Sequence, residues 1–127
     1  MPKLRTLVAA IAVAGSAAAA PMRHATVYNG SLYDRETGEL RLNLRAGYTY
    51  AYDGACDLDC SDLDFALYRW VPATPYRHAY WKHVGSDRAP DNTPFLTVTP
   101  PVDALYRLDI IMARCTREPC GYDVDVY

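Results

Sequence analysis

Residues 106–112 read Tyr-Arg-Leu-Asp-Ile-Ile-Met, and large apolar side chains occupy every second position of this stretch. These side chains share one face of an extended chain: Tyr106, Leu108, Ile110 and Met112. Arg107 and Asp109 fall on the opposite face, because successive side chains of a strand alternate. The period is two residues and not the 3.6 residues of a helix. The stretch therefore predicts a β-strand with one dry face and one wet face.

The same rhythm recurs to either side of this stretch. Residues 39–44 place three leucines on one face, and residues 62–67 alternate aspartate or alanine with Leu63, Phe65 and Leu67. We expect about eight strands, near residues 25–33, 39–44, 48–53, 63–71, 79–84, 95–99, 104–113 and 121–127. Polar turns rich in glycine or proline separate them, which predicts an all-β sandwich or barrel.

The N-terminus has the layout of a secretory signal peptide. Lys3 and Arg5 precede a short apolar run over residues 6–15, and small residues follow. Cleavage after Ala18 or Ala19 is favoured, because proline at position 21 disfavours a cut after residue 20. We predict a signal peptide over residues 1–19 and a single domain over residues 20–127. A membrane anchor or a buried N-terminal helix is the alternative, although a bilayer span needs ~20 apolar residues.

The formal charge of the chain limits the classes of partner that it can bind. Loss of Lys3 and Arg5 with the signal peptide changes the formal charge from −2 to −4. A mildly acidic chain argues against nucleic acid, whose binders carry a basic face, and against anionic membrane surfaces. We expect neither partner for the processed chain.

Four cysteines lie in the processed part, and an even number in an exported chain indicates disulfides and an oxidising compartment. The protein is thus expected to be secreted or periplasmic. A bridge needs Cα atoms about 4.4–6.8 Å apart, whereas four residues of a strand span about 13 Å. Local pairs Cys56–Cys60 and Cys115–Cys120 therefore require tight loops, which the expected strands allow. Cross-pairing of the four cysteines is the alternative.

Two stretches carry a family resemblance: residues 44–50 (LRAGYTY) and residues 56–68 (CDLDCSDLDFALY). With residues 91–94, 96–100 and 106–108, they resemble the bacterial pre-peptidase C-terminal domain family and its cysteine-containing standalone relatives, over about residues 25–127. The resemblance implies a jelly-roll-like antiparallel β-sandwich without catalysis of its own. Members usually accompany exported proteases and other exported enzymes, and some relatives bind calcium and fibrous protein.

An acidic cluster is the sharpest local feature, with four aspartates within eight residues: Asp57, Asp59, Asp62 and Asp64. Calcium prefers several oxygen ligands from flexible loops, so these residues are candidate calcium ligands. The spacing of an EF-hand is absent. The alternative is that the aspartates solvate a turn and bond backbone groups or an arginine.

A second candidate site is aromatic, and its members flank one proline-rich loop: Trp70, Tyr76, Tyr80 and Trp81. Aromatic side chains stack on sugar rings and anchor protein interfaces. Core packing and protection of a sheet edge are the alternatives.

No motif in the sequence names an active site, so we do not expect an enzyme. The favoured hypothesis is an exported non-catalytic module that binds a protein or glycan partner, with calcium as a candidate stabilising ion. The alternative is an accessory or structural protein that aids export or assembly of a secreted enzyme.

Overall fold

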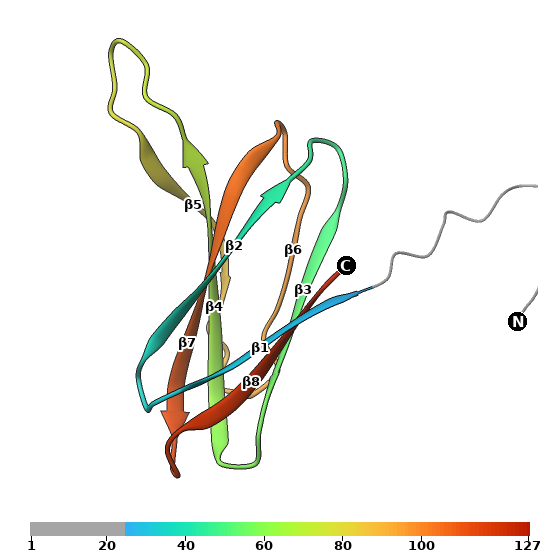
Figure 1. The fold of residues 1–127 in the computed structure, drawn as a ribbon, viewed down its shortest axis with the longest axis vertical. Helices are drawn as coiled ribbons and strands as arrows, with labels where there is room; N and C mark the ends of the chain where they lie inside the picture. The colour runs from blue at the N-terminus through green and yellow to red at the C-terminus, as the bar shows by residue number, and fades with distance from the viewer. Residues whose placement is uncertain (1–24) are drawn as a thin grey trace, which may run out of the picture.

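The computed structural model describes residues 25–127 (Figure 1), so the predicted signal peptide lies outside the described residues. The described chain forms strands and no helix: β1 (Thr26–Leu32), β2 (Thr37–Leu44), β3 (Tyr50–Cys56), β4 (Cys60–Val71), β5 (Tyr80–Asp87), β6 (Phe95–Val98), β7 (Ala104–Cys115) and β8 (Cys120–Val126). The prediction of an all-β chain of about eight strands is confirmed. Over residues 25–127 there is accordingly no helix that could cross a membrane.

The strands form two antiparallel four-stranded sheets that pack face to face (Figure 1). One sheet has the order β1-β8-β3-β6, here called the acidic sheet because it carries Asp53, Asp123 and Asp125; the other has the order β2-β7-β4-β5, here called the hairpin sheet. Within residues 25–127, every connection between consecutive strands crosses from one sheet to the other except that between β4 and β5. The predicted β-sandwich is therefore confirmed.

The interior is built from the alternating side chains that the sequence marks. On β7 the predicted stripe from Tyr106 to Met112 is at most 1% exposed, and on β4 so are Leu63, Phe65 and Leu67. Leu108 lies opposite Leu40 on one side and opposite Leu67 on the other. Burial of such side chains stabilises each by roughly 1.5–3 kcal/mol relative to exposure, so β7 and β4 form the centre of the core.

The four cysteines lie at the ends of strands, whereas we predicted from the sequence that they lie in the loops between strands. β3 ends at Cys56 and β4 begins at Cys60, so the expected strands 48–53 and 63–71 are shifted or extended toward the bridge. The cause is the Cys56–Cys60 disulfide. It limits the connection to residues 57–59, so the strands continue up to the two cysteines.

Gly54 on β3 permits a close approach of Phe65 from the opposite sheet. A Cβ atom at this buried position of β3 would lie 2.5 Å from Cζ of Phe65 and 2.8 Å from Cγ of Pro94. Real contacts are never this short, so Phe65 can fill the core only because position 54 has no side chain.

We expect Gly54→Ala to lower the free energy of unfolding by about 1–3 kcal/mol, the usual cost of an overpacked core. Gly85→Ala is the matched control, because a Cβ there would meet only Leu96 at 3.9 Å. That control should change stability by less than about 0.5 kcal/mol. Urea denaturation of both variants measures the difference, and equal losses would refute the role of the Gly54 contact.

Candidate functional site

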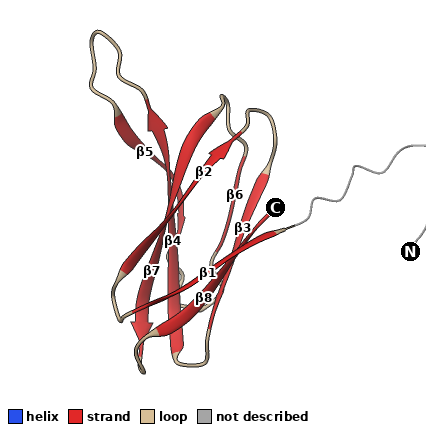
Figure 2. Ribbon diagram, in the orientation of Figure 1, coloured by secondary structure: helices blue, strands red, loops and turns tan. Residues whose placement is uncertain are grey.

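The connection between β4 and β5, residues 72–79, projects beyond the sandwich as a hairpin (Figure 2). Near its tip, Thr74 and Arg77 form a separate antiparallel bridge, with Thr74 N–H donating to Arg77 O at 2.9 Å and Arg77 N–H donating to Thr74 O at 3.3 Å. Pro75 occupies the first turn position, where its fixed φ is favourable. The tip is therefore an ordered turn, and it holds Tyr76 with 97% exposure.

The hairpin stands on an aromatic base on the outer face of the hairpin sheet. Trp70 and Trp81 are register partners across β4 and β5, and their rings meet edge to face with centroids 5.1 Å apart. The next pair down the strands, Tyr68 and His83, packs in the same way at 5.3 Å. Such pairs stabilise a sheet by roughly 0.5–1.5 kcal/mol beyond their burial, so they hold the base of the hairpin rigid.

Two arginines complete this aromatic base. The guanidinium of Arg107 on β7 lies 4.5 Å from the ring centroid of Tyr68 and 4.9 Å from that of Trp81. Arg41 on β2 also lies over Trp81, at 5.3 Å. Asp109 orients Arg107 through two hydrogen bonds of 2.8 and 3.2 Å, a bidentate geometry that fixes the guanidinium plane. The indole of Trp81 therefore makes cation–π contacts with two guanidinium groups of the same chain.

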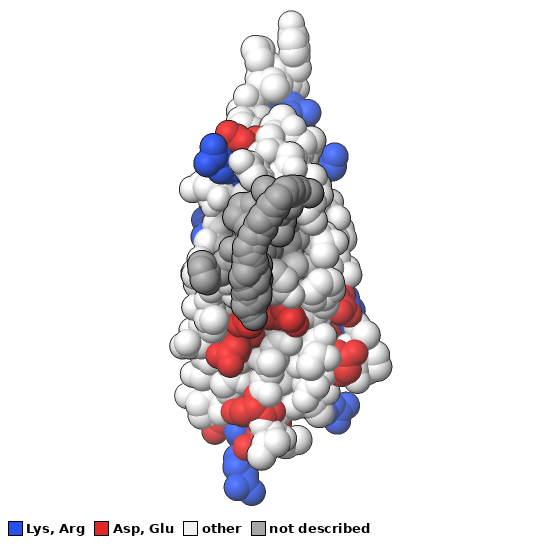
Figure 3. Space-filling model, turned by 90° about the vertical axis from the view of Figure 1, so that its right-hand side faces the viewer, with Lys and Arg blue, Asp and Glu red and all other residues white. Residues whose placement is uncertain are grey.

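The hairpin and the adjoining parts of β4 and β5, residues 65–86, carry positive charge. Residues 65–86 include Arg69, Arg77 and Lys82 but no aspartate or glutamate. Figure 3 shows lysine and arginine at both ends of the molecule, whereas most of the visible acidic residues lie in the half away from the hairpin. The chain is thus acidic in total but positive where the hairpin projects.

The predicted aromatic set is only partly brought together. Trp70 and Trp81 touch, whereas Tyr76 lies at the tip and Tyr80 faces away from Trp81 by strand alternation, beneath the guanidinium of Arg77 at 5.1 Å. Sequence reasoning missed the other members of the base: Tyr68, His83, Arg41 and Arg107. Their contacts join β2, β7, β4 and β5 and depend on strand register, which no local motif encodes.

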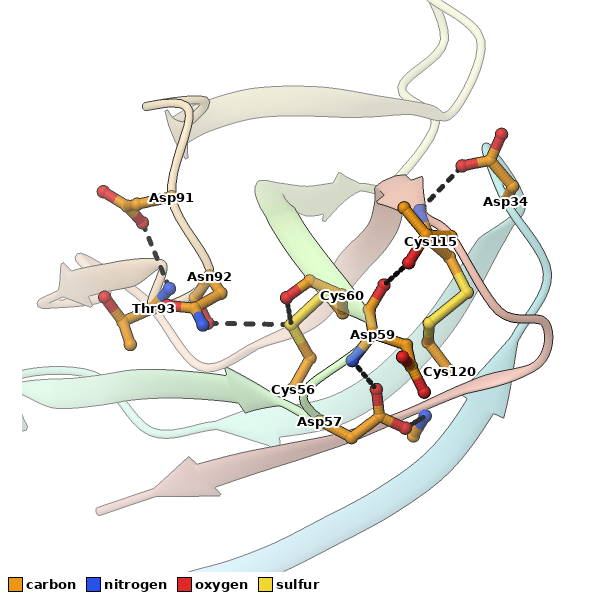
Figure 4. Close-up of a disulfide and its surroundings, with 12 residues drawn as sticks. Asp34, Cys56, Asp57, Asp59, Cys60, Asp91, Asn92, Thr93, Cys115 and Cys120 are labelled. Carbon is orange, nitrogen blue, oxygen red and sulfur yellow. Dashed lines mark hydrogen bonds between the residues drawn. A yellow bond between two sulfur atoms is a disulfide. The ribbon is translucent and has the colours of Figure 1, made fainter.

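The opposite end of the sandwich is closed by two disulfides (Figure 4), and the predicted pairing is confirmed. Cys56–Cys60 spans 5.9 Å between Cα atoms and Cys115–Cys120 spans 6.0 Å. Each bridge links the last residue of one strand to the first residue of the next, in the other sheet. Cys60 and Cys115 are register partners, so the two bridges lie side by side.

The predicted calcium ligands do not converge. Asp57 Oδ1 accepts the Asp59 N–H at 3.1 Å and its Oδ2 accepts the Gly121 N–H at 2.7 Å (Figure 4), so this carboxylate bonds backbone groups. Asp62 and Asp64 lie on β4 instead. Within residues 25–127 no three His, Cys, Asp or Glu side chains could together hold a metal ion. Because calcium takes six to eight oxygen ligands, the four-aspartate set fits poorly; calcium binding stays a prediction.

Asp62 and Asp64 form a carboxyl pair on the outer face of β4. Asp64 is only 8% exposed, and one oxygen of each carboxyl is buried without a hydrogen-bond donor. Burial and then the adjacent Asp62 raise the pKa of Asp64 to about 6, while Asp87 acts in the same direction and Arg88 opposes them. Ionisation of Asp64 at neutral pH therefore costs free energy.

A groove of about 570 Å³ opens between the sheets at the end opposite the disulfides. Tyr28 and Tyr50 of the acidic sheet and Leu42 of the hairpin sheet form its walls, and these side chains also pack against the core. The groove is thus the open end of the interior. Among residues 25–127, the ionisable side chains that line the groove are those of Arg45 and four tyrosines.

Comparison with known proteins identifies the fold and no family. Neither a protein-family model nor a curated protein sequence matches the chain. CorA, a surface-associated copper-binding protein of Methylomicrobium album BG8, has a similar structure, with a TM-score of 0.62 over 80% of this chain and 92% of that chain, at 10% identity. PliG of Aeromonas hydrophila, a periplasmic inhibitor of g-type lysozyme, gives a TM-score of 0.47 over 82% and 87% at 16% identity. The resemblance to the pre-peptidase C-terminal family stays a prediction.

We expect Asp64→Asn to stabilise the protein at neutral pH. The pKa of Asp64 is higher in the folded chain, about 6, than its ordinary value of 3.8, so the folded state binds the extra proton and wild-type stability falls as pH rises from about 4 to 7. The variant should gain roughly 1–3 kcal/mol above pH 7 and little below pH 4. Thermal melts across this range test the difference. Asp59→Asn is the control, and parallel profiles for wild type and Asp64→Asn would contradict the expectation.

Proposed function

We propose that this chain is an exported, non-catalytic binding module whose contact surface is the projecting hairpin and its aromatic base. The single observation that carries the proposal is Tyr76, 97% exposed on a turn that two backbone hydrogen bonds close. A tyrosine held on an ordered, exposed turn can anchor a protein interface by filling a pocket of the partner. The two disulfides support export, because such bridges persist in oxidising compartments.

The composition of the surface supports a protein partner. Tryptophan, tyrosine and arginine dominate the energetic hot spots of protein interfaces. This surface has all three, with Tyr76 and Arg77 at the hairpin tip and Trp70 and Trp81 at its base. The turn is already ordered, so less conformational entropy is lost on binding. Sugar stacking is less well supported, since guanidinium groups lie over Trp81.

The charge of the surface supports an acidic partner. The hairpin and its strands carry Arg69, Arg77 and Lys82 without a single carboxylate between Asp64 and Asp87. Electrostatic complementarity accelerates encounter and selects among partners. A protein surface with an aromatic-sized pocket and an acidic rim would match both the shape and the charge of the hairpin.

The proposal predicts that Tyr76→Ala weakens capture of partner proteins by at least about tenfold. The folded wild type, immobilised on a resin, is exposed to extracytoplasmic proteins of the native host, and bound proteins are quantified by mass spectrometry. Tyr33→Ala is the matched control, because Tyr33 is 58% exposed in the distant β1–β2 connection. High salt should also reduce capture.

Two outcomes would overturn the proposal. One is a wild type that retains no protein above the level of the bare resin. The other is equal retention by Tyr76→Ala and Tyr33→Ala. Binding to a glycan array, with no protein captured, would instead support a glycan ligand.

A further inference from the structure

The outer face of the acidic sheet carries negative charge that nothing on the same strands balances. Asp53 on β3 and Asp125 on β8 lie directly opposite each other. Asp123 is two residues before Asp125 on β8 and lies on the same face. The four strands of this sheet contain no lysine or arginine. Like charges opposite each other in a sheet are destabilising, so this face favours a cationic partner.

A shallow depression of about 290 Å³ lies on this face near the disulfide end. Gly121 contributes no side chain to it, while Asp57 and Asp123 supply carboxylates. The depression combines open space, which an aromatic side chain could fill, with negative charge, which could pair with a cation. Tyr76 and Arg77 at the hairpin tip would require both features of a binding site.

The hairpin tip has the complementary features. Tyr76 projects into solvent, and the next residue is Arg77, on a segment without acidic side chains. The hairpin leaves one end of the hairpin sheet, whereas the depression lies on the acidic sheet, near the disulfides at the other end. The two features therefore cannot meet within one molecule.

We propose that a second copy of this chain is one partner of the hairpin: Tyr76 of one copy enters the depression of another, and Arg77 pairs with Asp123. This inference rests on the proposed function, because it uses the hairpin as the contact surface. The contact joins two different patches, so each copy has one hairpin and one depression to offer, and the association is head to tail. A single small contact of this kind is weak and reversible.

Analytical ultracentrifugation of the processed, disulfide-bonded protein tests the inference. We expect the average mass to rise with protein concentration and to fall toward the monomer in high salt. Tyr76→Ala and Asp123→Lys should each weaken association at least tenfold. Tyr33→Ala should associate as wild type does, and thermal melting verifies that every variant is folded.

Mixing the two variants gives the decisive result. Tyr76→Ala keeps an intact depression and Asp123→Lys keeps an intact hairpin, so an equimolar mixture should form a dimer and grow no further. A wild type that stays monomeric up to about millimolar concentration would overturn the inference, as would a mixture that stays monomeric or variants that associate like wild type. Because Asp123→Lys retains the hairpin, it should still capture other proteins; self-association can thus fail while the proposed function stands.

Discussion

The packing of two sheets against one interior constrains every connection that passes between them. Side chains such as Phe65 and Leu108 can be buried only if the opposite sheet lies directly over them, and the approach at Gly54 leaves no spare space. Connections that cross between sheets must therefore stay close to the ends of the sandwich. In the described chain the β4–β5 connection alone stays within one sheet, and it alone is free to project.

The two ends of the sandwich consequently differ. At one end, adjacent disulfides fix two crossing connections, and Asp57 and Asp34 bond the backbone of Gly121 and Cys115 across those connections. At the other end, the sheets separate at the groove and the hairpin extends from β4 and β5. One end is thus closed covalently, while the other carries aromatic and cationic side chains on an ordered turn.

Much of the fold could be predicted from the sequence, and little of the site. The alternation from Tyr106 to Met112 and the spacing of the cysteines are local signals, and both gave correct predictions. The stacking of Arg107 on Tyr68 and Trp81 depends on register between strands distant in sequence. The hydrogen bond from the Gly121 N–H to Asp57 likewise joins residues distant in sequence, so no local pattern predicts it.

The bridge between Thr74 and Arg77 also affects how readily proteases can cut the hairpin. Proteases that cut after basic residues require an extended, locally unfolded segment, and exposed loop tips are their usual targets. Arg77 lies on such a tip, yet its own N–H and C=O groups are both bonded to Thr74, and Pro72 and Pro75 stiffen the adjacent chain. The two hydrogen bonds that order the turn around Tyr76 are therefore expected to slow proteolytic nicking of the loop.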